Sequence, residues 1–246
     1  MSRFYVPPEK VDRELERIVL DAEEAHHAID VMRLKEGDAI TVFDGKGNEY
    51  RCSIERVRKA PASLLMSILD QKTIPAVNGL TLHLLQAIPK KDKIELIIEK
   101  AVEIGVDSVT AVVTERTVSR PDKTAVPKKL ARWRKIALEA AKQSGRADVP
   151  AVFFAQNLER AKEIIPDYDL ILCAHLNEGT SPLKTALKGF SGGKVLLMIG
   201  PEGDFTPREI DSLKAKNVKF VSLGRNVLKS DTAALYLLSV VKYELT

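Results

Sequence analysis

Glu202 is the acidic residue of this chain best placed for a catalytic or ligand-orienting role. It lies in the segment 199–209, Ile-Gly-Pro-Glu-Gly-Asp-Phe-Thr-Pro-Arg-Glu, in which turn residues follow an apolar run. A carboxylate in such a loop can take up a proton or orient a bound ligand. The alternative is a turn carboxylate that stabilises the positive end of the next helix. Thr206, Pro207 and Glu209 predict that this helix starts with a capping box.

A second loop of similar composition follows about one βα unit later. The segment 219–223 predicts a strand, 224–229 a loop, and Ser230 or Asp231 the start of an apolar helix. In this loop, Arg225 and Lys229 supply positive charge. Val227 and Leu228 supply apolar surface that could cover a flat ring. Strand–turn–helix units leave backbone N–H and C=O groups exposed at the carboxyl end of a sheet, where open α/β sheets bind ligands. We therefore expect the two loops to form one pocket; for the first loop alone, a tight turn without function is the alternative.

Positive charge is concentrated between Arg116 and Arg146. The segment carries ten basic and two acidic residues, a net charge of +8, whereas the whole chain has a net charge of +4. On a helix over 128–144, most of the bases share one face, which can follow a phosphate backbone and release its counterions. Gln143 and Arg146, at the end of this helix, can read a base or hold a phosphate. The alternative is a solvated helix face.

Alternating strands and helices must position these residues. From residue 80 onward the sequence predicts strands at 80–88, 108–114, 149–155, 169–175, 195–199 and 219–223, and helices at 91–104, 128–144, 158–165, 182–187, 207–216 and 231–244. Such alternation predicts an α/β domain with a mainly parallel sheet covered on both faces. The first strand runs into Ile-Pro-Lys-Lys without a glycine-rich turn, so a standard dinucleotide fold is not expected.

The first part of the chain has a different pattern. Strands are predicted at 39–43, 49–57 and 64–69, the first two joined by the hairpin signal Asp-Gly-Lys-Gly-Asn, with a short helix over 21–32. We predict two domains, residues 1–72 and 73–246, with 73–79 as a linker.

Bulk composition narrows the class of protein. The chain has 246 residues, of which 45% are hydrophobic and 29% are charged, as in globular proteins. Cys52 and Cys173 lie in apolar runs and are expected to be core thiols of a cytoplasmic protein, with no signal peptide or membrane span. Neither a metal site nor a Ser-His-Asp arrangement is indicated.

Four motifs, in order, resemble the RsmE-type family. They are Glu-Lys-Ala-Val-Glu-Ile-Gly-Val at 99–106, Glu-Ala-Ala-Lys-Gln-Ser-Gly-Arg at 139–146, Ile-Gly-Pro-Glu-Gly at 199–203, and Leu-Gly through Thr-Ala at 223–233. The family comprises bacterial 16S ribosomal RNA (uracil-N3)-methyltransferases of the SPOUT superfamily, and the resemblance covers essentially the whole chain. It implies a parallel-sheet SPOUT α/β domain with a C-terminal trefoil knot, preceded by a small PUA-like β-barrel RNA-binding domain.

The resemblance also implies function and site residues. S-adenosylmethionine is the expected cofactor, 16S ribosomal RNA of the small ribosomal subunit the expected partner, and a homodimer the expected assembly. Arg146 and Glu202 are the expected catalytic residues. Cofactor contacts are expected from Cys173, His175, Leu176, Met198, Ile199, Gly200, Pro201, Glu202, Gly203, Leu223, Gly224, Val227 and Leu228. RNA contacts are expected from Arg116, Arg132, Lys135, Glu139, Lys142, Gln143, Arg146, Arg225 and Lys229.

Three residues depart from the usual family pattern. Asp204 stands where a second glycine is usual, Lys229 where an arginine is usual, and Asp231 where a glutamate is usual. Two other functions stay open: a knotted ribose 2′-O-methyltransferase, and a ribosome-assembly RNA-binding protein without turnover.

Overall fold

A computed structural model describes residues 3–74, 79–176 and 179–246. The chain divides into two compact units, one made of Met1–Pro75 and Ala141–Val149, the other of Ala76–Ala140 and Pro150–Thr246. Most of the predicted linker 73–79 lies outside the described residues. None of the helices in the described part of the chain is both long enough and apolar enough to cross a membrane.

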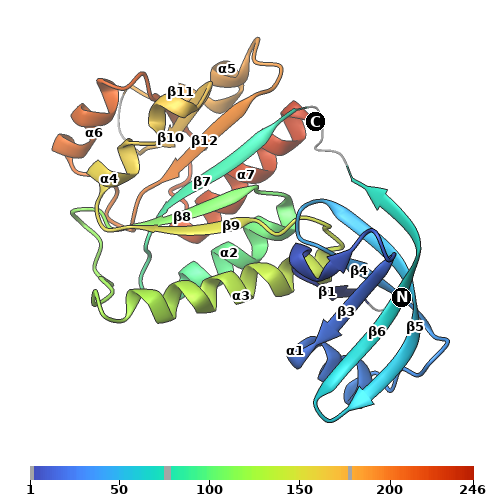
Figure 1. Ribbon diagram of the computed structural model, residues 1–246. Coiled ribbons are helices and arrows are strands. Elements are labelled where there is room, and N and C mark those ends of the chain that lie inside the picture. Colours follow the sequence, from blue (N-terminus) through green and yellow to red (C-terminus); the bar gives the residue numbers. More distant parts are fainter. Residues whose placement is uncertain (1–2, 75–78, 177–178) are drawn as a thin grey trace. The chain divides into compact units, whose positions relative to one another are not determined.

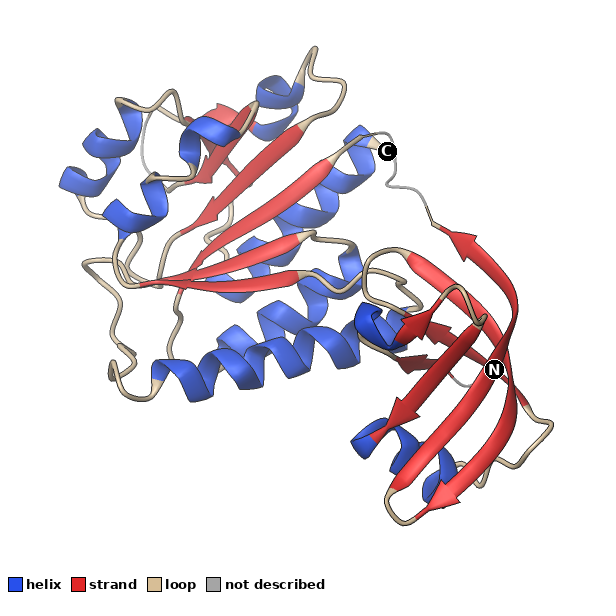
Figure 2. Ribbon diagram, in the orientation of Figure 1, coloured by secondary structure: helices blue, strands red, loops and turns tan. Residues whose placement is uncertain are grey.

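The first unit is built on a curled six-stranded sheet (Figure 2). Its strand order is β1-β4-β5-β6-β3-β2, with β1 parallel to β4 and every other pair antiparallel. The strands are β1 (Arg3–Tyr5), β2 (Val11–Asp12), β3 (Arg17–Asp21), β4 (Ala39–Phe43), β5 (Asn48–Lys59) and β6 (Ala62–Thr73), with the short helices η1 (Pro8–Lys10), α1 (Ala22–His26) and η2 (His27–Val31). The predicted β4–β5 hairpin, β6 and the helix that starts at residue 22 are confirmed. Strands β1, β2 and β3 were not predicted.

Asp44 organises the β4–β5 hairpin. Its side chain is 2% exposed, and its carboxylate accepts hydrogen bonds from Lys46 N, Asn48 N and Asn48 Nδ2 at 2.8, 3.1 and 2.7 Å. Gly45 and Gly47 have φ of +72° and +93°, a region that glycine adopts without steric cost. The Asp-Gly-X-Gly-Asn signal thus becomes a loop closed around one buried carboxylate.

Residues 141–149 fold onto this hairpin. Gly47 N donates to Ala147 O, Val149 N donates to Gly45 O, and Arg3 Nη2 donates to the carbonyl of Arg146 at 2.9 Å. The sequence-based division assigns these residues to the second domain, because strand and helix periodicity carries no information about which hairpin a connecting segment will bond.

The second unit is a parallel seven-stranded sheet between two layers of helices (Figure 1). The strand order is β11-β13-β10-β12-β7-β8-β9, made of β7 (Thr81–Ala87), β8 (Ser108–Val112), β9 (Ala151–Ala155), β10 (Leu170–Ala174), β11 (Ser181–Pro182), β12 (Lys194–Ile199) and β13 (Lys219–Ser222). Helices α2 (Lys93–Ile104), α3 (Val126–Ser144) and α7 (Ser230–Leu245) lie on one face, and α4 (Leu158–Lys162), α5 (Leu183–Leu187) and α6 (Pro207–Lys214) on the other. A short η3 (Ile165–Asp167) follows α4. The predicted alternation is confirmed.

The central strands place four chain segments at one edge of the sheet. Strands β13, β10, β12 and β7 are neighbours, and all run in the same direction. β10 and β12 are apolar because both of their faces are buried. The loops that follow Ala87, Ala174, Ile199 and Ser222 must therefore meet at the carboxyl edge.

Candidate functional site

A pocket of about 300 Å³ lies at this carboxyl edge. It is formed by the ends of β10, β12 and β13, the loops that follow them and the start of α7, and both glycine-containing loops contribute. Its lining residues are Ala174, His175, Leu176, Ile199, Gly200, Pro201, Glu202, Asp204, Ser222, Leu223, Gly224, Arg225, Asn226, Val227, Leu228, Lys229, Ser230 and Ala233. The prediction that the two loops form one pocket is thereby confirmed.

Buried hydrogen bonds hold the loop 200–204 to the start of α7. Ser230 Oγ donates to the carbonyl of Gly200 at 2.8 Å and accepts from Gln86 Nε2 at 2.9 Å. Gln86, which is fully buried, also donates to Ala87 O at 2.7 Å. This chain of bonds joins β7, the first glycine loop and α7, and so fixes the floor of the pocket.

Two more bonds tie the same loop to neighbouring connections. Glu202 Oε1 accepts from the backbone N–H of Lys90 at 2.8 Å, which links the loop to the segment between β7 and α2. Arg116 Nη1 donates to the carbonyl of Gly203 at 2.6 Å, which links it to the segment between β8 and α3. Lys91 and Asp92, next to the first link, have φ of +56° and +50°.

Helix α6 leaves the pocket with the predicted capping box. Thr206 Oγ1 accepts from Glu209 N at 3.3 Å, and Glu209 Oε2 accepts from Thr206 N at 2.9 Å. Glu209 is buried, and its other carboxylate oxygen accepts from Glu115 N at 2.9 Å. The cap therefore fixes the direction in which the chain leaves the loop, and Glu202 is not the residue that caps this helix.

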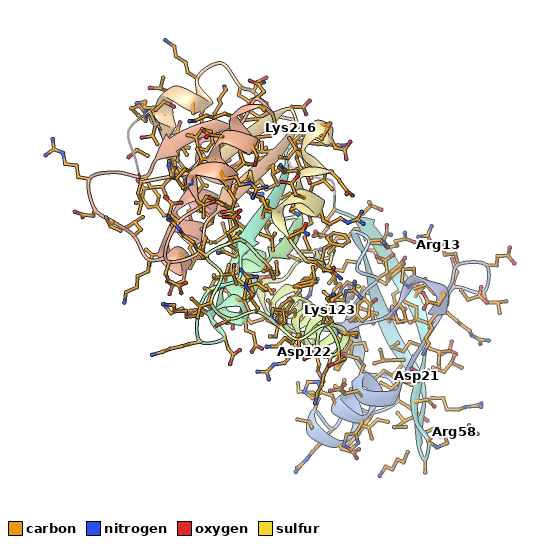
Figure 3. All side chains as sticks on the ribbon, turned by 90° about the vertical axis from the view of Figure 1, so that its left-hand side faces the viewer. Arg13, Asp21, Arg58, Asp122, Lys123 and Lys216 are labelled. Carbon is orange, nitrogen blue, oxygen red and sulfur yellow. The ribbon has the colours of Figure 1, made fainter. Side chains whose placement is uncertain are left out.

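The second glycine loop is the exposed wall of the pocket. In Figure 3 the connection between β13 and α7 stands away from the sheet, and Val227 is 75% exposed. At the base of the loop, Lys93 Nζ donates to Asp231 Oδ2 at 2.9 Å. Burial acts to raise the pKa of Asp231, but the hydrogen bond and charge of Lys93, together with backbone N–H groups, outweigh it and lower that pKa. The wall is thus anchored at α7 and open along its length.

Most of the predicted cofactor residues line this pocket, and three do not. Cys173 and Met198 are fully buried in the core beneath it, and Gly203 points its carbonyl at Arg116. Burial, together with the nearby Asp204 carboxylate, holds the pKa of the Cys173 thiol well above its ordinary value. Cys173 is accordingly a neutral core thiol that lies beneath the pocket-lining residues Ala174 and Asp204.

The predicted RNA contacts are dispersed between the two units. Arg225 and Lys229 line the pocket, and Arg132 Nη2 in the second unit pairs with Glu95 at 2.7 Å. In the first unit, Lys142 Nζ pairs with Glu24 at 2.6 Å, and Arg146 Nη2 pairs with Asp148 at 2.5 Å. Gln143 is exposed, and Lys135 and Glu139 lie with Arg132 on α3. Ion pairing thus neutralises part of the predicted basic face.

The two predicted catalytic residues belong to different units. Glu202 lines the pocket of the second unit, whereas Arg146 lies in the segment that folds onto the first unit. The Arg146 side chain is 14% exposed and turned to Asp148. Glu202 and Arg146 therefore do not belong to one site within a single unit.

A second hollow of about 590 Å³ lies against the β7–β9 side of the same sheet. His83 is at its base, hydrogen-bonded to Tyr168 Oη and to Thr110 Oγ1, the latter at 2.8 Å. Burial lowers the pKa of His83 to about 4, so the ring is neutral at pH 7. In the part of the chain that the structure describes, no residue of the loops after β10, β12 and β13 lines this hollow, so the smaller pocket is the better candidate site.

Comparison with known proteins identifies the family. A model of the RNA methyltransferase domain matches residues 77–242, and a model of the RNA methyltransferase PUA domain matches residues 20–63. The ribosomal RNA small subunit methyltransferase E of Bacillus subtilis is 30% identical over 99% of this chain and 97% of its own length. The chain belongs to the ribosomal RNA small subunit methyltransferase E family. The Synechocystis member is 33% identical over 94% of this chain and 74% of its own length.

Solved structures of RsmE-type proteins have the same fold. A Legionella pneumophila methyltransferase, solved with bound S-adenosylmethionine, has a TM-score of 0.84 at 30% identity and covers 98% of this chain and 97% of its own. The ribosomal RNA small subunit methyltransferase E of Neisseria gonorrhoeae, also bound to S-adenosylmethionine, has a TM-score of 0.83 at 27% identity, with coverage of 99% and 98%. The predicted fold class, a parallel-sheet α/β domain preceded by a PUA-type domain, is confirmed. The trefoil knot stays a prediction of the resemblance.

Several pocket residues were not predicted from the sequence. Asp204, Ser222, Ser230 and Ala233 line the pocket, and Lys90 bonds to Glu202. Ser230 was visible as a helix start, but nothing local shows that its hydroxyl reaches Gly200. Asp204 was noted only as a departure from the family pattern.

Proposed function

We infer that this protein transfers the methyl group of S-adenosylmethionine to N3 of a uridine in 16S ribosomal RNA of the small ribosomal subunit. The observation that carries this inference is the pocket formed jointly by the loops after β12 and β13, in a chain of the ribosomal RNA small subunit methyltransferase E family. Members of the same fold bind S-adenosylmethionine in their solved structures.

The residues present fit this cofactor. A volume of about 300 Å³ is at the lower end for sites that hold a drug-sized ligand. The walls combine exposed backbone, the apolar side chains Leu176, Val227 and Leu228, and the acidic side chain of Glu202. Gly200 lies in a cradle where a Cβ would come within 3.1 Å of Asp204 Oδ1. Apolar cover suits an adenine ring, and a carboxylate suits a cationic ligand.

When bound, S-adenosylmethionine supplies a methyl group on a positively charged sulfur, which an in-line nucleophile accepts. The task of the protein is then to position the uracil and to manage its N3 proton, since neutral uracil carries a hydrogen at N3. Positioning alone supplies a large part of the rate in such transfers. A base near N3, or a cation near the uracil oxygens, supplies the rest.

Glu202 is the residue that we assign to proton removal or orientation. Its Oε1 is held by the backbone N–H of Lys90, so the second carboxylate oxygen is the one available to a ligand. Arg146 is assigned to holding a phosphate or the uracil oxygen. Its pairing with Asp148 has to open for that contact.

The remaining predicted RNA contacts follow the same division. We propose that the first domain, residues 1–72, binds RNA as a PUA-type module, and that the bases of α3 with Arg225 and Lys229 hold the phosphates near the target. Counterion release then makes RNA affinity fall steeply with salt. The protein acts in the cytoplasm, where its ribosomal substrate is made.

A homodimer is proposed for the active form. Tyr236 and Tyr243 on α7 are 46% and 82% exposed, and Leu96 on the adjoining α2 is 45% exposed. Burial of these side chains against a second copy removes apolar surface from water. Light scattering that gives the mass of one chain at micromolar concentration contradicts the dimer.

The experiment that tests the function is methyl transfer followed by nucleoside analysis. The protein is incubated with S-adenosylmethionine carrying a labelled methyl group and with small ribosomal subunits from cells that lack it. Mass spectrometry of the digested RNA is expected to find the label in N3-methyluridine. Label on a ribose 2′ oxygen supports the knotted 2′-O-methyltransferase instead, and cofactor binding without any label supports an assembly factor.

A further inference from the structure

Asp204 has a backbone conformation that is costly for any residue other than glycine. Its φ is +59°, in the left-handed region, where asparagine and aspartate are tolerated better than other residues but glycine has no steric cost. Nothing in the turn itself needs a side chain there, because the turn is closed by the backbone bond from Asp204 N to Pro201 O at 2.9 Å. The carboxylate therefore has to compensate through its contacts.

The Asp204 carboxylate contacts both its own loop, after β12, and the loop after β10. Oδ1 accepts from Phe205 N at 2.7 Å, within its own loop. Oδ2 accepts from the backbone N–H of Leu176 at 3.3 Å, in the loop after β10, and lies 2.7 Å from His175 Nδ1. The loop after β12 and the loop after β10 are 28 residues apart in sequence at this bond.

The pair with His175 is secluded from solvent. The two side chains are 7% and 15% exposed, and the His175 ring packs edge-on against Phe220 at 5.8 Å. Within the described residues, His175 Nδ1 forms no hydrogen bond of regular geometry. The polar atom that it contacts is Asp204 Oδ2, at 2.7 Å. A contact between two polar side chains with so little solvent around it is shielded by water far less than one on the surface.

Both residues also line the pocket, as does Leu176. We propose that Asp204 and His175 are positioning residues that clamp the loop after β10 to the loop after β12, and so fix one wall of the S-adenosylmethionine pocket in its binding geometry. The proposal rests on the proposed function only for the identity of the ligand. A preformed wall raises affinity because ligand binding then orders less of the chain.

Asp204→Gly is the decisive variant. Glycine relieves the left-handed strain, so a loss of affinity in this variant is not caused by strain in the backbone. Loss of a hydrogen bond to a charged group is expected to raise the Kd of S-adenosylmethionine roughly tenfold or more in calorimetric titration. Since the clamp acts on binding, the KM for S-adenosylmethionine rises while kcat at saturating cofactor stays near that of the wild type.

Two further variants separate a clamp from a general weakening of the fold. Asp204→Asn keeps a carbonyl acceptor for Leu176 N and tolerates the left-handed region, so it is expected to restore part of the affinity. His175→Gln removes the ring, and its effect combined with that of Asp204→Gly is expected to be less than additive, since both substitutions remove the contact between the His175 ring and the Asp204 carboxylate. Asp211→Asn, a paired but 73% exposed aspartate on α6, is the matched control and leaves affinity unchanged.

Hydrogen exchange tests the clamp without any cofactor. The amide of Leu176 is expected to exchange faster in Asp204→Gly than in the wild type, because its acceptor is gone. Unchanged exchange at Leu176, wild-type affinity in Asp204→Gly, or fully additive effects in the double variant overturns the clamp. A wild-type protein that protects Leu176 but binds no S-adenosylmethionine overturns the proposed function and leaves the clamp standing.

Discussion

Adding one methyl group at Gly200 should damage the cofactor pocket far more than adding one at Gly203. Neither glycine has a left-handed φ, so alanine meets no backbone strain at either position. At Gly200 the new Cβ meets Asp204 Oδ1 at 3.1 Å, Asp204 Cα at 3.3 Å and Phe205 Cδ2 at 3.3 Å. Phe205 is 2% exposed and belongs to the core, so it cannot move aside.

At Gly203 the situation is different. The new Cβ meets only Arg116, with Cδ at 3.4 Å and Cβ at 3.7 Å, which is ordinary contact with an exposed side chain. Gly203→Ala is therefore a matched control for Gly200→Ala, with the same chemical change three residues further along the loop.

The size of the expected change in cofactor affinity follows from the free-energy cost of overpacking. Extra methyl groups in a closely packed site cost about 1–3 kcal/mol. If the loop absorbs that cost by moving out of its binding geometry, the Kd of S-adenosylmethionine rises roughly 5- to 150-fold. Gly203→Ala should stay within about threefold of the wild type.

Isothermal titration with S-adenosylmethionine measures both variants, and thermal unfolding shows whether each is folded. Equal affinities in Gly200→Ala and the wild type would refute the assignment of this loop to the pocket. An equal loss in both variants would refute the steric reasoning, because the structure gives Gly203 room.

Four further predictions follow from the geometry of the site and of the neighbouring hollow, each with its own measurement. Ser230→Ala removes the buried hydroxyl between Gly200 and Gln86, so the free energy of unfolding should fall by about 1–3 kcal/mol in urea titration; no change contradicts a structural role for this bond. Glu202→Gln keeps an acceptor for the backbone, so a single-turnover loss of about 10²-fold or more indicates a proton-transfer role, whereas a near-normal rate assigns Glu202 to orientation alone. Arg146→Ala should slow methylation at least tenfold without changing cofactor affinity, since Arg146 is not among the residues that line the pocket; an unaltered rate removes it from the mechanism. His83, with its pKa lowered to about 4 in the folded state, stays neutral while the unfolded chain takes up a proton below about pH 6.5, so stability should fall by about 2 kcal/mol between pH 7 and pH 5. His83→Gln should flatten that slope, and an unchanged slope in this variant assigns it to other groups.

The second unit was largely predictable because its signals are local. Every strand and helix predicted from residue 80 onward is present, since apolar runs of strand length alternate with amphipathic segments of helix length. The capping box at the start of α6 could be predicted because it involves only four consecutive residues, 206–209. The two-residue strand β11 was missed because two residues carry no periodicity.

The first unit was harder to predict for the same reason. Strands β1, β2 and β3 are short or flanked by charged residues, and each residue of β1 pairs with one 38 positions further along the chain, Phe4 opposite Val42 for example. The attachment of 141–149 depends on backbone bonds between distant segments. Such pairings are set by the tertiary structure and leave no trace in a local pattern.

The site was predictable in its loops but not in its connections. Residue types showed that 200–203 and 223–229 could hold a ligand, and parallel-sheet geometry brought them together. The bonds that fix the loops, from Ser230, Lys90 and Arg116, involve partners 30 to 112 residues apart. The sequence also does not show that Arg132 and Lys142, on the predicted basic face, form ion pairs with Glu95 and Glu24. A threaded chain is likewise beyond local reasoning, since knots are nearly absent from folds.

A crystal structure of the protein with S-adenosylmethionine tests the central claim most directly. The claim predicts density for the adenosine between the loop that contains Gly200 and the loop that contains Val227. Cofactor bound elsewhere, for example in the hollow beside His83, would contradict the claim.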